Sequence, residues 1–426
     1  MVDRYKRRTY LAGLAAGGLG GLSGCLDSIP VIGSGTGEDE VGGLDRTIKL
    51  GLLHSVTGDL QHVGTPIHNA GLLPITQLES ADVALEFDVE EADAETSPAV
   101  GVRRALALVE AGYPAINGAL SSDVTLQATQ QVLIPYRTVS CSPASTSPTI
   151  TALNDGGMVF RTAVSDSLQA VVLADQAAAE GHASAATMYV NNDYGYQLSR
   201  AFERSFAHDH GGTVAQQVPF EQAADGESVS YSSELSRAVD GDPDVLVLIG
   251  YTNSGAQLLR DLEASGADPA VLVTDGMKDE SLPERVDHSI EHVRGTAPLS
   301  AGPGKEYFDR LFEDEYGADP DSTPFNAHSY DATAILLLAN AFAGTNDGEA
   351  IGASIEPVTN DSGERIPPDD LARGIELAAE GELIEYVGAS SGVRFDENGD
   401  IAAANFEYWT FEDGAITQLE TVTIDG

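Results

Sequence analysis

Lysine is nearly missing from this chain of 426 residues, which contains it only at Lys6, Lys49, Lys278 and Lys305. Lysine and arginine together number 22 against 67 aspartates and glutamates, which gives a formal net charge of -45. A field of this sign excludes nucleic acid and an anionic membrane surface as binding partners. It also makes a folded domain repel itself unless salt screens the charges. We therefore expect an acidic protein adapted to a halophilic, very salty environment.

Cysteine is almost as rare, with Cys25 and Cys141 alone in the sequence. If Cys25 is consumed by processing, as argued below, Cys141 has no partner and no intramolecular disulfide is expected. A lone thiol in a segment of small residues is more typical of a buried core position than of a nucleophile.

The one hydrophobic leader is too short and too rich in glycine to span a membrane comfortably. It follows a basic stretch in which "RRTYL" resembles a twin-arginine export motif, and it ends in "LSGC", which resembles a lipobox. These patterns predict a signal peptide over residues 1–24, with lipid attached at Cys25 as the first mature residue. Residues 25–46, rich in Gly, Ser and acids, are predicted to be a flexible tether. The mature protein is then expected at the extracellular face of the cell membrane, held by its lipid anchor only.

Catalytic motifs are weak or missing. "GASSG" at 388–392 matches a nucleophile elbow centred on Ser390, but that motif needs a following helix, and "VRFDENGD" predicts a strand and a turn. His288 and His292 share one helical face without a third metal ligand in evident reach. No P-loop or strand-linked dinucleotide fingerprint follows the leader. We therefore predict a protein that is not an enzyme and that has no metal and no cofactor.

Strand and helix patterns alternate after the tether. Strands are predicted at 47–53, 83–90, 115–118 and 138–141, with helices at 62–80, 97–111 and 122–133. A second cycle predicts helices at 166–181, 195–210, 229–239 and 254–265, with strands at 186–193, 213–220, 244–250, 270–276 and 293–299. Helices are also expected at 306–317, 323–343 and 369–381, a polar insertion at 344–366, and strand, turn and strand in "VRFDENGD" and "FEYWTFEDGAI". This order predicts an α/β fold with two doubly wound lobes and a cleft between them.

Polar residues gather where these strands end, which is where ligands bind in such sheets. The stretch "SCSPASTSP" at 140–148 sets hydroxyls and turn amides between prolines, and its Ser142, Ala144, Ser145 and Thr146 are candidate ligand contacts. Ser121 and Ser122 precede a predicted helix whose free N–H groups favour an anion. The second cycle offers Tyr194, Tyr251 and Asp275. Hydroxyls, amides, phenols and one carboxylate suit a zwitterion such as an amino acid.

Six segments taken together resemble the leucine/isoleucine/valine-binding family, the type I periplasmic-style solute receptors of ABC importers. They are "IKLGLLHSVTGDL", "INGALSSDVT", "SPASTSPTIT", "YVNNDYGY", "AHSYDATAILLLANA" and "YVGASSGVRFDENGD", and the likeness covers nearly all of 47–426. The resemblance implies two Rossmann-like lobes joined by three crossovers: an N-lobe of 47–164 plus 300–400, and a C-lobe of 165–299 plus 401–426. It implies that Ser121 or Ser122, Ala144 and Thr146 hold the carboxylate and part of the ammonium, with Tyr194, Tyr251 and Asp275 matching the family's tyrosines and ammonium-binding acid.

The sequence departs from that family at the site. His62 or Val63 stands where an aromatic residue is common, His54 where proline is frequent, and Asp275 where a longer glutamate is often found. The expected function is an extracellular lipid-anchored solute-binding protein that takes an amino acid, of branched-chain type or a related small polar solute, and docks on ABC permease subunits. The alternatives are an extracellular ligand-sensing domain and a secreted hydrolase that uses Cys141, Ser390 or another serine.

Overall fold

A computed structural model of the protein describes residues 46–81, 83–223, 229–360 and 363–425. The predicted signal peptide, the lipidation site Cys25 and the tether up to residue 45 lie outside the described residues. Within the part of the chain that is described, none of the helices combines the length and hydrophobicity needed to cross a membrane.

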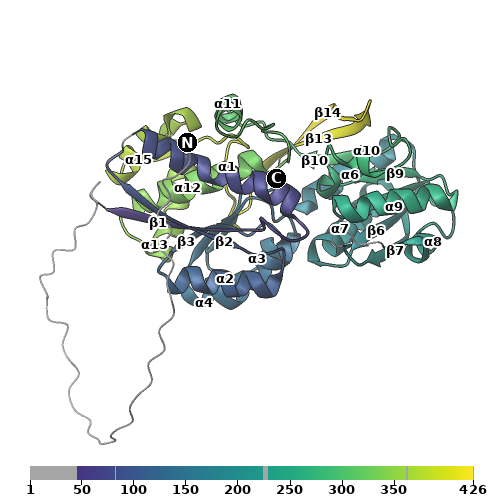
Figure 1. Ribbon diagram of the computed structural model, residues 1–426, viewed down its shortest axis with the longest axis horizontal. Coiled ribbons are helices and arrows are strands. Elements are labelled where there is room, and N and C mark those ends of the chain that lie inside the picture. Colours follow the sequence, from purple (N-terminus) through teal and green to yellow (C-terminus); the bar gives the residue numbers. More distant parts are fainter. Residues whose placement is uncertain (1–45, 82, 224–228, 361–362, 426) are drawn as a thin grey trace, which may run out of the picture. The chain divides into compact units, whose positions relative to one another are not determined.

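The N-lobe is built on a sheet of five parallel strands in the order β2-β1-β3-β4-β5 (Figure 1). The strands are β1 Thr47–His54, β2 Glu86–Asp93, β3 Ala115–Gly118, β4 Val139–Ser142 and β5 Val159–Arg161. In this order the chain reverses direction across the sheet between β1 and β3. The loops at the carboxyl ends beside such a switch point are the usual ligand site of a doubly wound sheet.

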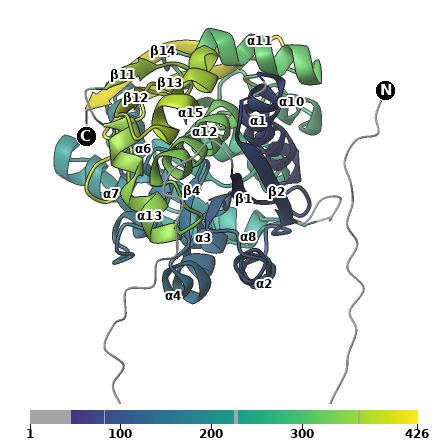
Figure 2. The ribbon, with the colours of Figure 1, turned by 90° about the vertical axis from the view of Figure 1, so that its left-hand side faces the viewer.

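Helices cover both faces of this sheet. Helices α1 (Gln61–Ser80) and α12 (Asn326–Ala343) lie on one face, and α2 (Pro98–Glu110) and α3 (Ser122–Ala128) on the other (Figures 1 and 2). Helix α12 is buried along 326–341 because it carries small and apolar residues all round and packs between the sheet, α1 and α15. The remaining elements of the lobe are η1 Thr129–Leu133, α4 Ile134–Tyr136, α5 Pro148–Thr151, α11 Lys305–Tyr316, α13 Gly348–Ala353, α14 Ile355–Thr359, β11 Glu364–Ile366, η3 Pro368–Asp370, α15 Leu371–Ala379 and β12 Ile384–Tyr386.

The C-lobe repeats the same winding. Its sheet runs β14-β13-β10-β9-β8-β6-β7, so the parallel strands β6 to β10 follow the order already seen in β1 to β5. Strands β13 and β14 extend the sheet in antiparallel fashion. The elements are α6 Asp166–Ala179, β6 Ser184–Val190, α7 Asp193–His210, β7 Thr213–Phe220, α8 Ser232–Ala238, β8 Val245–Ile249, α9 Thr252–Ser265, β9 Ala270–Val273, η2 Asp275–Met277, α10 Leu282–Arg285, β10 Arg294–Pro298, β13 Ala403–Glu412 and β14 Ala415–Asp425.

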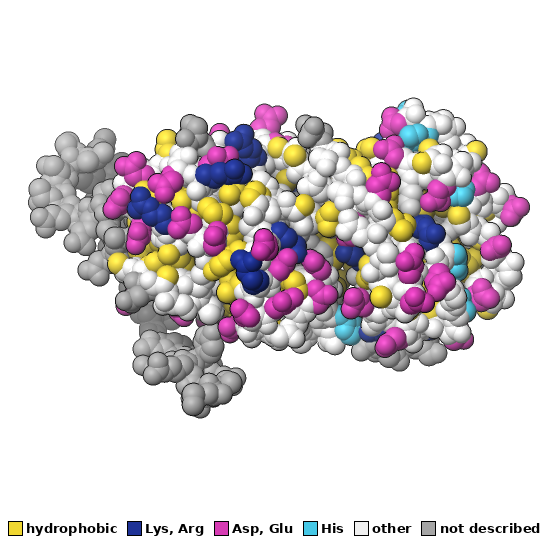
Figure 3. Space-filling view, turned by 90° about the horizontal axis from the view of Figure 1, so that it is seen from above, with side chains coloured by type: hydrophobic (Ala, Val, Ile, Leu, Met, Phe, Trp, Pro, Cys, Tyr) yellow, Lys and Arg dark blue, Asp and Glu magenta, His cyan; other side chains and the backbone are white. Residues whose placement is uncertain are grey.

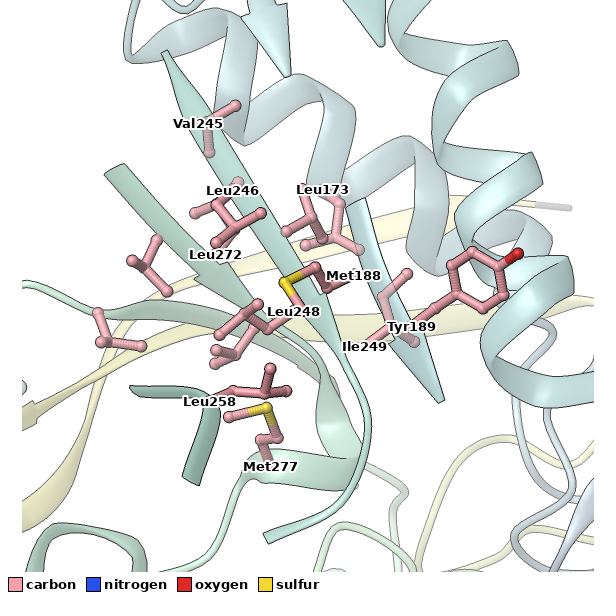
Figure 4. Close-up of a cluster of buried hydrophobic side chains, with 14 of the residues drawn as sticks. Leu173, Met188, Tyr189, Val245, Leu246, Leu248, Ile249, Leu258, Leu272 and Met277 are labelled. Atoms are coloured by element: carbon pink, nitrogen blue, oxygen red, sulfur yellow. The ribbon is translucent and has the colours of Figure 1, made fainter. Parts of the chain in front are cut away.

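The core of the C-lobe lies around its central strands. Strand β8 is buried at every position, as expected of a parallel strand covered on both faces. Figure 4 shows its Leu246 and Leu248 among side chains from the neighbouring strands, with Leu258 of α9 and Met277 of η2 close by. The element that carries Asp275 is therefore anchored in this core by Met277.

The predicted α/β fold of two doubly wound lobes is confirmed, and the chain passes between the sheets after β5, after β10 and before β13. The prediction of a polar insertion at 344–366 was wrong. That segment forms α13, α14 and β11, and Ile351 of α13 and Ile355 and Val358 of α14 are fully buried in the core of the lobe. The strand expected in "VRFDENGD" is reduced to a single bridge between Phe395 and Ile401.

The surplus of acid lies on the surface. Figure 3 shows Asp and Glu side chains spread over the visible face rather than gathered into one patch, with Lys and Arg fewer among them. Two ion pairs are instead largely buried, Arg161 with Asp400 and Lys278 with Glu407.

Candidate ligand-binding site

A cavity with residues from both lobes in its walls lies at the carboxyl ends of the strands. The space between its walls is about 700 Å³ when the part open to solvent is included. One wall is apolar and comes from the N-lobe: Leu60, Val63, Ile67, Leu120 and Phe325. The rest of the lining includes Ala144 and residues with polar side chains, among them Ser121, Ser122, Thr146, Tyr194, Tyr251 and Asp275. The structure thus brings together seven of the nine positions predicted to bind ligand.

The two serines that open α3 lie on the N-lobe side of the cavity. Ser121 occupies the position before the helix, but its hydroxyl makes no hydrogen bond to the helix backbone. The Ser122 hydroxyl accepts a hydrogen bond of 3.3 Å from the backbone N–H of Ser147. Both serines line the cavity, and the Ser121 hydroxyl does not make the capping bond that its position allows.

The loop after β4 reaches the cavity with Ala144 and Thr146 only. The Ser142 hydroxyl donates to the carbonyl of Ala119 at 2.6 Å and accepts from the backbone N–H of Ser145 at 3.1 Å. The Ser145 hydroxyl is hydrogen-bonded within the same two loops, 2.7 Å from the hydroxyl of Thr125. Ser142 and Ser145 are fully buried and line no part of the cavity. The structure places these two predicted residues behind the cavity wall, where they join the β4 loop to the β3 loop.

Arg161, which the sequence reading missed, supports this loop from behind. Its guanidinium donates to the carbonyls of Ser145 and Ser147 at 3.2 and 2.9 Å, and it pairs with both oxygens of Asp400. The side chain is fully buried. An arginine within a strand does not indicate in sequence that it supports a neighbouring loop. A buried arginine with this many acceptors fixes the path of the loop that presents Thr146.

Two tyrosines form the C-lobe wall. The rings of Tyr194 and Tyr251 stack with centroids 5.8 Å apart. The Tyr194 hydroxyl lies 2.9 Å from that of Thr274 and donates to Asp275 at 3.2 Å. The Tyr251 hydroxyl accepts from the Asn192 amide at 3.2 Å. Each phenol is thereby oriented by a partner from its own lobe.

Asp275 begins η2 at the end of β9, and 7% of its surface is exposed. The next residue has to be glycine, because a Cβ on Gly276 would lie 2.4 Å from the carbonyl oxygen of Gly250. Burial raises the pKa of Asp275 to about 6, although the side chains of Gln169 and Tyr194 favour its charged form. A carboxyl in this environment is ready to ionise opposite a cation.

The lobes contact each other beside the cavity. The Asp193 carboxylate, at the start of α7, accepts hydrogen bonds from the hydroxyls of Ser147 and Thr149 in the N-lobe. Its backbone N–H donates in turn to the carboxylate of Asp123 at 3.1 Å. This arrangement holds the two walls of the cavity near each other.

The residues considered for catalysis lie elsewhere. Cys141 is completely buried, and burial raises the pKa of its thiol far above its usual range. The Ser390 hydroxyl donates to the buried carboxylate of Asp331, and no helix follows it directly. In the described part of the chain no group of three or more His, Cys, Asp or Glu side chains is placed to hold a metal ion.

Two doubly wound lobes with a polar and apolar cavity between them define a two-lobed solute-binding protein. The model of the family described as "Periplasmic binding protein" matches residues 47–372, and the chain belongs to this family, in its type I fold.

Relatives of known sequence agree with this assignment. A chemotactic signal transduction system substrate-binding protein of Halobacterium salinarum is 27% identical over 308 residues, which are 71% of this chain and 71% of that protein. A Leu/Ile/Val-binding protein homolog of Brucella melitensis is 24% identical over 380 residues, which are 88% of this chain and 94% of that protein.

Solved structures share the fold. A leucine-binding protein of Thermotoga maritima superposes with a TM-score of 0.73 at 22% identity, covering 88% of this chain and 98% of its own. A branched-chain amino acid transporter substrate-binding protein of Streptococcus pneumoniae, in complex with isoleucine, superposes with a TM-score of 0.70 at 17% identity. The match covers 89% of this chain and 100% of that protein. A solute-binding protein of an ABC transporter from R. palustris, in complex with benzoate, superposes with a TM-score of 0.71 at 14% identity. The match covers 89% of this chain and 98% of that protein.

Proposed function

We propose that this protein is the lipid-anchored substrate-binding component of an ABC importer and that it binds a branched-chain type of amino acid between its lobes. One observation carries the proposal. The cavity combines hydroxyls and loop amides on one lobe, a buried carboxyl on the other and an apolar wall beside them. An α-amino acid with an aliphatic side chain presents the three complementary groups.

The ligand carboxylate is assigned to the N-lobe. Ser121, Ser122 and Thr146 offer hydroxyls there, and the loops that carry them offer backbone N–H groups. Among the residues that the structure describes, no lysine or arginine lines the cavity, so the carboxylate is assigned to hydrogen bonds from uncharged hydroxyl and backbone donors. The ligand ammonium is assigned to Asp275, whose carboxylate can form a charge-assisted bond.

The aliphatic side chain of the ligand is assigned to the wall of Val63, Ile67, Leu120 and Phe325. In this wall Ile67, Leu120 and Phe325 belong to one buried hydrophobic cluster, and Val63 packs against it. Burying a leucine-sized side chain there contributes about 1.5–3 kcal/mol. Sequence supports the remainder of the proposal: the twin-arginine and lipobox patterns favour export and attachment through Cys25 to the extracellular face of the membrane. Binding and delivery, rather than catalysis, is the proposed activity.

A second candidate is delivery of the bound solute to a chemotaxis receptor. The observation that favours it is the likeness to the Halobacterium salinarum protein, which is named for chemotactic signal transduction. Both candidates use the same cavity. They differ in the partner, and deletion of the gene separates them: loss of labelled leucine uptake indicates an importer, whereas loss of attraction to leucine with uptake intact indicates a sensor.

Calorimetry in molar salt tests the ligand assignment. L-leucine is compared with 4-methylpentanoate, which lacks the amino group, and with 3-methylbutylamine, which lacks the carboxylate. We expect L-leucine to bind at one site per chain and each of the other two to bind at least about a hundredfold more weakly, since each strands a buried polar group. Equal binding of 4-methylpentanoate would contradict the assignment of an ammonium to Asp275.

A further inference from the structure

A chain of hydrogen-bonding side chains runs through the N-lobe behind the apolar wall of the cavity. His54 ends β1 and His68 belongs to α1, and their Nδ1 atoms lie 3.2 Å apart. At one end of the chain, the Nε2 atom of His68 lies 2.8 Å from a carboxylate oxygen of Glu91 in β2. At the other end, the Nε2 atom of His54 lies 3.2 Å from the Oδ1 atom of Asn117 in β3. His54 and Asn117 are completely buried.

The amide of Asn117 fixes the direction of the hydrogen bonds. Its nitrogen donates to the backbone carbonyl of Ser329 at 3.0 Å and to the hydroxyl of Thr333 at 2.8 Å. The Thr333 hydroxyl donates in turn to the carbonyl of Gly71 at 2.8 Å. Since a carbonyl only accepts, the amide nitrogen must lie on this side, and the amide oxygen must accept from His54. His54 therefore carries a proton at Nε2.

The number of protons on the two rings follows from these contacts. An ionised carboxylate only accepts, and the hydrogen bond from His68 holds the pKa of Glu91 below its usual range, so His68 also carries a proton at Nε2. A third proton must lie between the two Nδ1 atoms, because two bare nitrogens would set lone pair against lone pair. Three protons on two rings make one of them an imidazolium. Burial, together with the nearby charge of His68, lowers the pKa of His54 to about 3, so the positive charge belongs to His68.

The elements packed against the two rings bring this charge one counter-ion, Glu91 of β2. Strand β3 and helix α12 contribute amide and hydroxyl groups, which are neutral. Asp93 of β2 and Asp331 of α12 are bonded to hydroxyl and backbone donors of their own. From α11, the Tyr316 hydroxyl donates to the carbonyl of Asn69 beside the His68 turn. The bond between the rings thus depends on one proton.

The chain joins the segments that supply the apolar wall. Three residues of that wall form one buried cluster: Ile67, Leu120 and Phe325. The first directly precedes His68, and the second follows Asn117 by three residues. The third lies one helical turn before Ser329, whose backbone N–H donates to its carbonyl at 3.0 Å. A change in the chain therefore reaches α1, the β3 loop and the start of α12 together.

We propose that His54 and His68 are positioning residues that hold the apolar wall in its binding geometry only while they share the third proton. The inference rests on the proposed function and deepens it, because it makes recognition of the aliphatic side chain depend on pH. When the pH rises and this proton leaves for bulk solvent, two lone pairs face each other and the rings separate. Helix α1 is then no longer fastened to the ends of β1 and β3, and the wall loses its fit to the ligand.

Calorimetry in molar salt between about pH 6 and pH 9 tests the inference, since histidine changes its charge in or near this range. The wild-type protein is titrated with L-leucine, which reaches the apolar wall, and with L-alanine, which presents only a methyl group to it. Affinity for L-leucine is expected to fall by about three- to tenfold across the range, as for the loss of one hydrogen bond. Affinity for L-alanine should fall much less, so the preference for leucine declines as the pH rises.

His68→Gln removes the imidazolium. This variant is expected to bind L-leucine about three- to tenfold more weakly than the wild type at about pH 6 and equally well at about pH 9. The amino group of the ligand also titrates at high pH, in all variants alike, so affinities are compared as ratios at each pH. Adding Glu91→Gln gives the conservative rescue, because two amides can close the chain to His54 without a charge. The double variant should keep high affinity across the range.

His210→Gln is the matched control. The Nε2 atom of His210 lies 2.8 Å from a carboxylate oxygen of Asp175, the distance seen between His68 and Glu91, but in the C-lobe and outside the cavity lining. This variant is expected to show the affinity and the pH profile of the wild type.

Nitrogen NMR of the histidine rings in the ligand-free protein counts the protons directly, with three N–H groups expected on His54 and His68 at about pH 6. Two N–H groups, a constant affinity ratio between wild type and His68→Gln, or equal losses for leucine and alanine would each overturn the inference while the proposed function stands. The wild-type profile and the proton count decide the matter even where a variant fails to fold. If the wild type binds L-leucine at no pH, the proposed function is contradicted and the inference falls with it.

Discussion

Replacing Asp275 by asparagine tests the ammonium assignment at a single atom position. The variant keeps the shape of the side chain and keeps an oxygen for the Tyr194 hydroxyl, which donates to it at 3.2 Å. It removes the negative charge that lines the cavity beside Tyr194. The fold should survive, since Gly276 and Met277 still hold η2 in place.

The size of the effect follows from two opposing terms. An ammonium about 3 Å from a carboxylate is attracted by about 5–6 kcal/mol at an effective dielectric constant of about 20. The ammonium gives up much of its hydration to enter the cavity, and net charge-assisted hydrogen bonds come to about 1.5–3 kcal/mol. Asp275→Asn should therefore weaken binding by about ten- to a hundredfold.

The affinity of the wild-type protein for L-leucine should depend on pH in a way that the affinity of Asp275→Asn does not. Burial raises the pKa of Asp275 to about 6, so its attraction for a cation is present above that pH and is lost as the pH falls through it. At about pH 5 roughly nine-tenths of this carboxyl is protonated, and wild-type affinity should fall by about tenfold more than that of Asp275→Asn.

Isothermal titration with L-leucine at several pH values measures both effects. Asp268→Asn is the control, because it removes one charge from an exposed position of the same lobe outside the cavity lining. If Asp275→Asn bound L-leucine as the wild type does, with the same pH profile, the ammonium would not be held at Asp275 and the reasoning would fail.

Three further changes test other parts of the account. Thr146→Val removes a hydroxyl from the cavity wall at constant shape, so calorimetry should show several-fold weaker binding at an unchanged melting temperature; unchanged affinity would remove Thr146 from the site. Lowering the salt from molar to dilute buffer should unfold the protein as followed by circular dichroism, and restoring salt should refold it, because the net charge of -45 is then unscreened; equal stability in both would contradict a halophilic adaptation. Cys25→Ser should release the protein from membranes into the medium, and intact-mass data showing an unmodified Cys25 on membrane-bound protein would refute the lipid anchor.

Much of the fold could be predicted because the strands are strongly patterned. Buried parallel strands such as β8 appear as short apolar runs, and the alternation with helices fixes their winding. The helices α13 and α14 were missed because Gly, Asn and Asp around them suggest a loop. Their signal was the helical spacing of Ile351, Ile355 and Val358, which the structure buries in two consecutive short helices.

The site was predictable where a residue follows a strand directly. Tyr194, Tyr251 and Asp275 follow β6, β8 and β9, and all three line the cavity. Arg161 could not be found in this way. An arginine in a strand is an ordinary surface feature in sequence, and only the folded N-lobe, where it contacts the loop after β4 and Asp400, buries it.

The central claim is that the cavity holds a small molecule with both an amino and a carboxylate group. The most direct test is mass spectrometry of the ligand released from protein purified, without denaturation and in molar salt, from the cells that produce it. The account predicts a primary amino acid with an aliphatic side chain, at about one molecule per chain. A released solute that lacks an amino group, such as an aromatic acid or an amide, would contradict it.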